Sequence, residues 1–215
     1  MTRREGLLRL AALFMAVWLG GVALPADAGL LPGEGEEFEV VAPAMPLSGD
    51  KPVVEEVFNF KCPHCDDMAP VVEAWEKKQQ GRIELRLVPV YWGQQTDAPL
   101  RAFFAAQFMG MGREMAQAIF EGHFRRKVDI ESPEALARLA APLGLAPEEM
   151  LKQMKSFGVG AKVSQALARW KALGVDSTPT LVVNGRFRIS TGHARGDFNR
   201  MLATAERLAL HPPAP

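Results

Sequence analysis

The chain has only two cysteines, and they stand together in Cys62-Pro63-His64-Cys65, directly after the apolar run 53–60. A Cys-x-x-Cys pair that ends a strand and opens a helix places one sulfur at the helix N-terminus, where unpaired amides and the helix dipole favour a thiolate. The thiolate is the reactive form of cysteine. The spacing therefore predicts a thiol-disulfide redox site.

Helical spacing gives the two sulfurs unequal roles. Cys65 shares one apolar face with Met68, Ala69 and Val72, at i, i+3, i+4 and i+7, and is therefore expected to be buried. Cys62 precedes that face and lies nearest the free amides of the first turn, so it is expected to be the accessible, attacking sulfur.

Pro63 and His64 suit the start of such a helix. Proline in the first turn loses no hydrogen bond, because that turn has no intrahelical partner for its N–H groups. A protonated His64 would place a positive charge beside a Cys62 thiolate and lower its pKa. Stabilising the reduced form in this way makes the Cys62-Cys65 disulfide a stronger oxidant.

Two other interpretations of the cysteine pair are weaker. Tetrahedral zinc requires four ligands, and the sequence has no second cysteine pair and only scattered histidines, His123, His193 and His211. A structural disulfide would close a very short loop and so remove little entropy from the unfolded chain. We expect neither a metal nor a bound cofactor.

The elements around the motif predict an α/β fold. Residues 53–60 and 83–90 are expected to be strands joined by a helix over 66–80, which implies a right-handed crossover and a parallel pair, and residues 38–41 a short edge strand. Helices are expected at 98–109, at 113–121, from Ser132-Pro133-Glu134, from Pro147, and at 159–173. Strands at 180–183 and 186–189, joined by an Asn184-Gly185 hairpin turn, precede a final helix at 197–210.

The N-terminus indicates export. Arg3 and Arg4 precede an apolar stretch from Leu10 to Leu24, and Ala26-Asp27-Ala28 offers a small-x-small cleavage site. We expect residues 1–28 to be a signal peptide cleaved after Ala28. A retained membrane anchor is the alternative, although the stretch is shorter than the ~20 residues that a span needs.

Charge excludes one class of partner. Basic and acidic residues balance at 25 each, so no polybasic field favours nucleic acid or an anionic membrane.

With the distal segment Val175-Asp176-Ser177-Thr178-Pro179-Thr180, these features resemble the DsbA-type periplasmic thiol:disulfide oxidoreductases of the thioredoxin superfamily, over residues 38–210. The resemblance implies a thioredoxin fold with a helical subdomain inserted between the strand-helix-strand half and the C-terminal hairpin-helix half. We assign 29–96 and 175–215 to the thioredoxin-like domain and 97–174 to the inserted helical domain.

The resemblance also implies a substrate-binding role for Thr178 and Pro179. It gives Pro179 a cis peptide bond beside the active-site disulfide, which leaves the Thr178 backbone free to pair with an extended substrate. An ordinary trans proline at a strand start is the alternative.

Glu56 and Arg86 are the candidates for adjusting the protonation of the site. Strand alternation places Glu56 on the face of Val54 and Phe58, where an unpaired carboxylate is costly. The family has a buried acid six positions before the first cysteine and a basic partner on the next strand, which Glu56 and Arg86 match. A surface ion pair is the alternative.

The expected function is that of an exported thiol:disulfide interchange protein that donates the Cys62-Cys65 disulfide to folding secreted proteins with free thiols. Reoxidation would come from a membrane quinone-linked partner of the DsbB type, and a monomer is expected. A disulfide isomerase or reductase is one rival, and a non-catalytic peptide-binding module is another.

Overall fold

The computed structural model describes residues 31, 33–45 and 49–213, so the predicted signal peptide lies outside the described residues. The strands are β1 (Glu39–Val40), β2 (Val53–Phe58), β3 (Glu84–Pro89), β4 (Thr180–Val183) and β5 (Phe187–Ser190). The helices are α1 (Pro63–Gln79), α2 (Ala98–Phe108), α3 (Gly112–Phe124), α4 (Pro133–Ala140), α5 (Pro147–Met154), α6 (Phe157–Ala172) and α7 (Phe198–Leu210), with a 3-10 turn at Ala141–Leu143.

The strands form one mixed sheet in the order β1-β5-β4-β2-β3. β2 and β3 are parallel, as the strand-helix-strand pattern predicts, and the other neighbours are antiparallel. Asn184 and Gly185 both have positive φ, 52° and 62°, which confirms the two-residue hairpin turn between β4 and β5.

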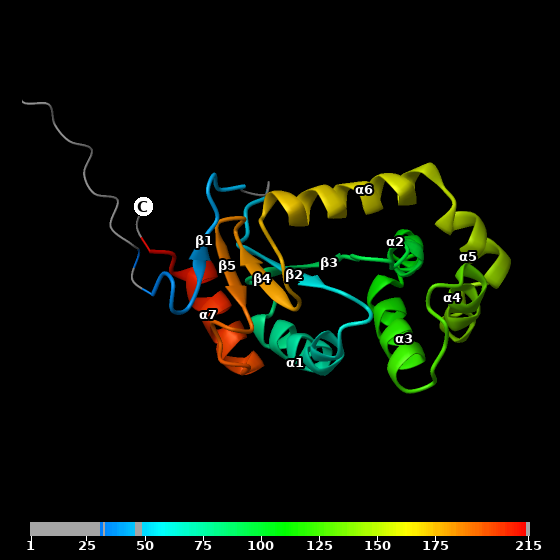
Figure 1. The fold of residues 1–215 in the computed structure, drawn as a ribbon, viewed down its shortest axis with the longest axis horizontal. Helices are drawn as coiled ribbons and strands as arrows, with labels where there is room; N and C mark the ends of the chain where they lie inside the picture. The colour runs from blue at the N-terminus through cyan, green and yellow to red at the C-terminus, as the bar shows by residue number, and fades with distance from the viewer. Residues whose placement is uncertain (1–30, 32, 46–48, 214–215) are drawn as a thin grey trace, which may run out of the picture. The chain divides into compact units, whose positions relative to one another are not determined.

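Helices cover both faces of this sheet (Figure 1), with α1 and α7 on one face and α6 on the other. On the first face, Val54 and Leu181 pack against α1 and α7 through Met68, Val72 and Met201. Val57 and Val182, on the second face, belong instead to the core that continues into α2–α6. The expected helical insertion is therefore present and shares a hydrophobic core with the sheet.

An aromatic cluster connects the end of β2 to the helices. Phe58 and Phe60 pack against each other with ring centroids 5.1 Å apart, and both contact Phe103 of α2 and Phe120 of α3 at 5.1 to 6.3 Å. The Phe58–Phe60 and Phe58–Phe103 contacts are edge-to-face, a packing that adds to the free energy gained from burial alone. Since β2 leads directly into the cysteine motif, this cluster holds the motif against the helical region.

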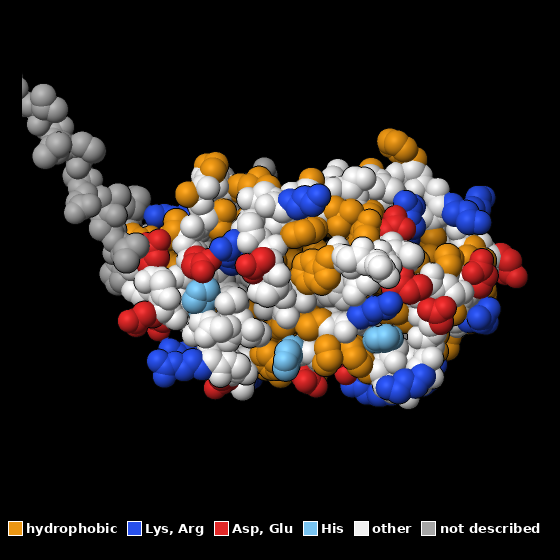
Figure 2. Space-filling model, in the orientation of Figure 1, with side chains coloured by type: hydrophobic (Ala, Val, Ile, Leu, Met, Phe, Trp, Pro, Cys, Tyr) orange, Lys and Arg blue, Asp and Glu red, His pale blue; other side chains and the backbone are white. Residues whose placement is uncertain are grey.

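Charges are mixed over the molecular surface. Figure 2 shows basic and acidic side chains interspersed on one face, without a field of a single sign. Among the described helices, none combines the length and apolarity that crossing a membrane requires.

Candidate active site

The cysteine motif forms the first turn of α1. Cys62 is the N-cap residue, with extended backbone angles, and its carbonyl accepts from the N–H groups of Cys65 at 3.1 Å and Asp66 at 3.2 Å. Pro63 occupies the first helical position, so the helix begins there and not at Asp66. The sulfur of Cys62 thus lies at the positive end of a helix dipole.

Asn59 shapes the turn that enters the motif, a role not anticipated from the sequence. Its main-chain oxygen accepts from Cys62 N at 3.0 Å, and its side-chain oxygen accepts from Lys61 N at 2.7 Å. Its amide nitrogen donates to the Val90 oxygen and to Gln95, so this side chain is buried and fully bonded. The signal in the sequence is an amide between two phenylalanines at the end of an apolar strand.

The two sulfurs differ in environment as the helical spacing predicts. Cys65 is fully buried and Cys62 is half-buried, and both carry free thiols. The pKa of Cys62 is lowered from 9.0 to about 5, chiefly by a hydrogen bond from the Cys65 thiol, while burial opposes the shift. The Thr178 side chain and the main-chain amides of Cys65 and His64 act in the same direction.

Burial raises the pKa of Cys65, and the neighbouring Cys62 reinforces this effect. At neutral pH the reduced pair therefore holds one thiolate, on Cys62, and one thiol, on Cys65. A pair with this distribution of charge performs thiol-disulfide exchange through Cys62, the more accessible sulfur.

The segment before β4 brings its main chain to Cys62. The Thr178-Pro179 peptide bond is cis, as the family resemblance implies. The Cys62 Sγ lies 3.3 Å from the Thr178 carbonyl oxygen, to which the thiol donates. Thr180 Oγ1 donates to the Ser177 oxygen at 2.9 Å and thereby anchors this segment to β4.

His64 is exposed at the second position of α1. Its main-chain amide is one of the donors that lower the pKa of Cys62. That a protonated His64 imidazole also stabilises the Cys62 thiolate remains a prediction.

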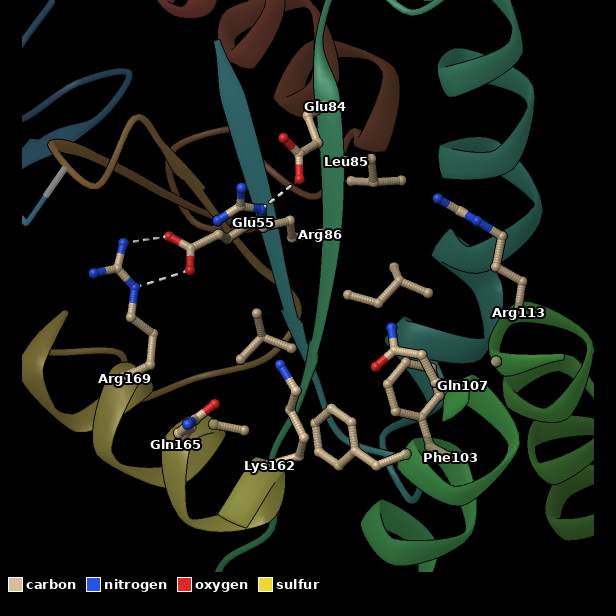
Figure 3. A pocket seen from close by; sticks show the side chains of 15 residues that line it. Glu55, Glu84, Leu85, Arg86, Phe103, Gln107, Arg113, Lys162, Gln165 and Arg169 are labelled. Atoms are coloured by element: carbon tan, nitrogen blue, oxygen red, sulfur yellow. Dashed lines mark hydrogen bonds and ion pairs between the residues drawn. The ribbon is translucent and has the colours of Figure 1, made fainter. Parts of the chain in front are cut away.

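Glu56 and Arg86 are not brought together. In the parallel register Glu56 lies opposite Leu87, and Arg86 lies opposite Glu55. Residues directly opposite share a face of the sheet, so Arg86 projects from the face opposite to Glu56. Its Nε donates to Glu84 Oε1 at 2.6 Å (Figure 3), and the expected pairing with Glu56 is therefore wrong.

Glu56 is only 4% exposed and lines a cavity of about 230 Å³ between α1 and α3. Burial raises its pKa to about 7, against the lowering effect of Arg113, and Glu76 raises it further. Its cationic neighbour thus comes from α3 of the helical insertion, which sequence reasoning about adjacent strands could not find.

A second buried acid, Glu55, is paired on the opposite face. Arg169 of α6 binds it with two hydrogen bonds of 2.9 and 2.7 Å, and also donates to the Met45 oxygen at 2.9 Å. Figure 3 shows this fork between α6 and β2. The pair joins the last helix of the insertion to β2, an interior strand of the sheet.

Ion pairs also connect the motif itself to the insertion. Lys61 Nζ lies 2.5 Å from Glu131 Oε1, and Arg125 Nη1 lies 3.0 Å from Asp66 Oδ1. These contacts place loops of the helical region beside Cys62. Phe103 and Phe104 of α2 are buried in the core and also line a cavity of about 500 Å³ beside β3. In the described part of the chain no three His, Cys, Asp or Glu side chains gather as metal ligands would.

Comparison with known proteins supports the same chemistry. A family model described as "DSBA-like thioredoxin domain" matches residues 75–201. The chain belongs to the DsbA-like thioredoxin family.

Named DsbA proteins are similar to this chain over most of its length. The thiol:disulfide interchange protein DsbA of Burkholderia cepacia is 31% identical over 159 residues, covering 73% of this chain and 75% of its own. The DsbA of Pseudomonas aeruginosa is 27% identical and covers 87% of this chain and 88% of its own. The crystal structure of oxidoreductase DsbA from Xylella fastidiosa superposes with a TM-score of 0.76 at 28% identity, and the match covers 84% of this chain and 97% of the Xylella chain. This DsbA-like chain is a thiol:disulfide oxidoreductase.

Proposed function

We propose that the mature chain, after removal of residues 1–28, works in the periplasm as a disulfide donor to folding exported proteins. The observation that carries this proposal is the position of Cys62 Sγ at the tip of α1, beside the buried Cys65 thiol, where its pKa is lowered to about 5. Stabilising the reduced form raises the reduction potential of the Cys62-Cys65 disulfide, so electrons flow from the substrate to the protein.

The transfer takes two exchange steps. A substrate thiolate attacks Cys62 Sγ, the bond between Cys62 and Cys65 breaks, and Cys65 leaves and takes up a proton. A second substrate thiolate then attacks the substrate sulfur of the mixed disulfide, and Cys62 leaves as the stabilised thiolate. The substrate loses two electrons and gains a disulfide, and the protein becomes the dithiol.

The remaining site residues take supporting roles in this proposal. Thr178 and Pro179 present the backbone against which an extended substrate pairs next to Cys62, Pro63 starts the helix, and His64 donates its amide to the sulfur. Glu56 adjusts protonation from the cavity behind α1.

The domain division and the partners complete the proposal. Residues 29–96 and 175–215 carry the redox site, and the inserted domain, 97–174, borders it. A membrane quinone-linked partner of the DsbB type reoxidises the dithiol, and the protein works as a monomer.

The test is the redox equilibrium of the purified protein with glutathione. An oxidising potential, well above that of thioredoxin, is expected, whereas a potential as low as thioredoxin's would contradict the direction of transfer. Refolding of a scrambled disulfide protein separates the oxidase from an isomerase. A peptide-binding module would keep its activity after alkylation of Cys62.

A further inference from the structure

The outer edge of β3 carries unpaired main-chain groups. β3 is the last strand of the sheet and pairs, within the described chain, with β2 alone. The N–H of Glu84 donates to the Pro52 oxygen at 2.9 Å, which fixes the phase of the ladder. Because consecutive residues direct their N–H and C=O groups to opposite edges, those of Leu85 and Leu87 point away from β2. No described residue hydrogen-bonds to them.

Cavities follow this edge from end to end. Three of them, of about 500, 230 and 510 Å³, adjoin one another: the first and third share Glu84 and Leu85, the first and second share Leu87 and Arg113, and the second and third share Glu76. Together they form one groove along the edge of β3, which we name the β3 groove.

The two walls of the β3 groove differ in chemistry. Figure 3 shows the α6 wall, where Lys162 and Gln165 face the strand. Lys162 is exposed and makes no ion pair with a described residue. The wall between α1 and α3 combines apolar side chains, among them Val72, Ala116 and Phe120, with the four acids Glu56, Glu73, Glu76 and Glu114.

We infer that the β3 groove binds an extended polypeptide segment that adds a strand to β3. The outward N–H and C=O groups of Leu85 and Leu87 are spaced two residues apart, which is the period at which an extended chain forms hydrogen bonds along one edge. A compact ligand does not present donors and acceptors at this spacing. Pro89 has no N–H, so pairing ends there.

The walls also define the sequence that fits. Successive side chains of a strand point to opposite faces, so one set enters the 230 Å³ cavity between α1 and α3 and the other meets Lys162. The four glutamates of that cavity disfavour acidic residues there, whereas Lys162 attracts them on the other side, so the favoured segment alternates uncharged apolar residues with acidic ones. In the cell the partner is an unfolded stretch of a client protein; this identification rests on the proposed function, whereas the mode of binding does not.

The groove leads toward the redox site. Val90, the residue after β3, is bonded through its carbonyl to Asn59, which in turn holds the turn before Cys62. A client strand on β3 would thus be held on the same body that presents the reactive sulfur.

The probe for the test is the cysteine-free peptide acetyl-Thr-Val-Asp-Val-Asp-Val-Thr-amide, with the same peptide carrying lysine for aspartate as comparison. Calorimetry measures affinity, and amide hydrogen exchange measures protection residue by residue. We expect the acidic peptide to bind more tightly than the lysine peptide and to protect the Leu85 and Leu87 amides. Binding without protection at these two amides would overturn the inference, as would equal affinity for both peptides.

Matched charge reversals complete the test. Lys162→Glu on α6 should weaken binding of the acidic peptide by about fivefold, because it replaces an attraction at the rim with a repulsion. Lys152→Glu, an equally exposed lysine on α5 outside the groove, should leave affinity unchanged. Equal effects of the two reversals would contradict the inference.

The outcome is independent of the redox proposal, because the peptide has no thiol. Binding at β3 by a protein with a reducing potential would overturn the oxidase direction and leave the groove standing. An oxidising protein that fails to bind the peptide would overturn the groove alone.

Discussion

At the scale of single residues, the reactive property of this protein is the ionisation of Cys62. The Cys65 thiol and the main-chain N–H groups of Cys65 and His64 donate to this sulfur, and each favours the thiolate over the thiol. The largest contribution comes from Cys65 in the α1 turn, and the Thr178 side chain adds a smaller one from a distant part of the chain.

We expect the thiolate absorbance of the reduced protein to appear with a midpoint near pH 5 instead of 9.0. A folded-state pKa below the unfolded value means that the reduced fold gains stability from Cys62 above pH 9 and loses it as the pH falls toward 5. Cys65→Ala removes the largest cause and should raise the midpoint. The Cys62→Ser variant is the control, and a wild-type midpoint near that of free cysteine would refute the assignment.

Glu56 should make the stability of the fold depend on pH with the sign opposite to that of Cys62. Its folded pKa of about 7 lies above the ordinary 4.5, so its contribution to stability is present below pH 4.5 and is lost as the pH rises through 7. The shift corresponds to about 3 kcal/mol at most. Glu56→Gln should therefore be more stable than wild type at pH 8 and nearly equal at pH 4, in urea unfolding at each pH.

The control for Glu56 is Glu148→Gln, an exposed acid on α5. It should change stability by less than about 0.5 kcal/mol at both pH values. If Glu56→Gln shows the same flat profile, the buried carboxyl is not the titrating group.

At the scale of elements, the insertion and the sheet are joined by charged side chains as well as by a core. The Glu55–Arg169 fork binds α6 to β2, and Lys61–Glu131 binds the motif to the loop before α4. The fork is the more consequential of the two, because Glu55 is only 2% exposed.

Removing one partner of that fork should be costly. Arg169→Met leaves a buried carboxylate without its cation and should lower the free energy of unfolding by about 3 to 5 kcal/mol. The double replacement Glu55→Met with Arg169→Met should recover much of the loss, because no buried charge remains. Arg207→Ala breaks the exposed pair with Glu37 and should cost less than about 1 kcal/mol. Urea titrations of wild type and the three variants measure these free energies of unfolding. A double variant as unstable as Arg169→Met would contradict this account.

At the scale of the whole molecule, local patterns predicted the elements well. The α1 face, the Ser132 cap and the Asn184-Gly185 turn each depend on residues a few positions apart, and the structure has all three. The partner of Glu56 was predicted wrongly, because the assignment to Arg86 needed a register that no local pattern contains. A shift of one residue moves a side chain to the other face of the sheet.

The sequence by itself determined the chemistry: two cysteines at helical spacing after a strand, with one sulfur on the apolar face and one before it. Only the tertiary structure decided which groups surround them. Thr178 reaches Cys62, Arg113 approaches Glu56, and Arg169 pairs with Glu55 across separations set by the register of the sheet and the packing of the insertion. The thiolate of Cys62 is favoured chiefly by Cys65 within the motif, and Thr178 adds to this effect from a distant part of the chain. The burial and pKa of Glu56, by contrast, depend on the packing of the insertion against the sheet.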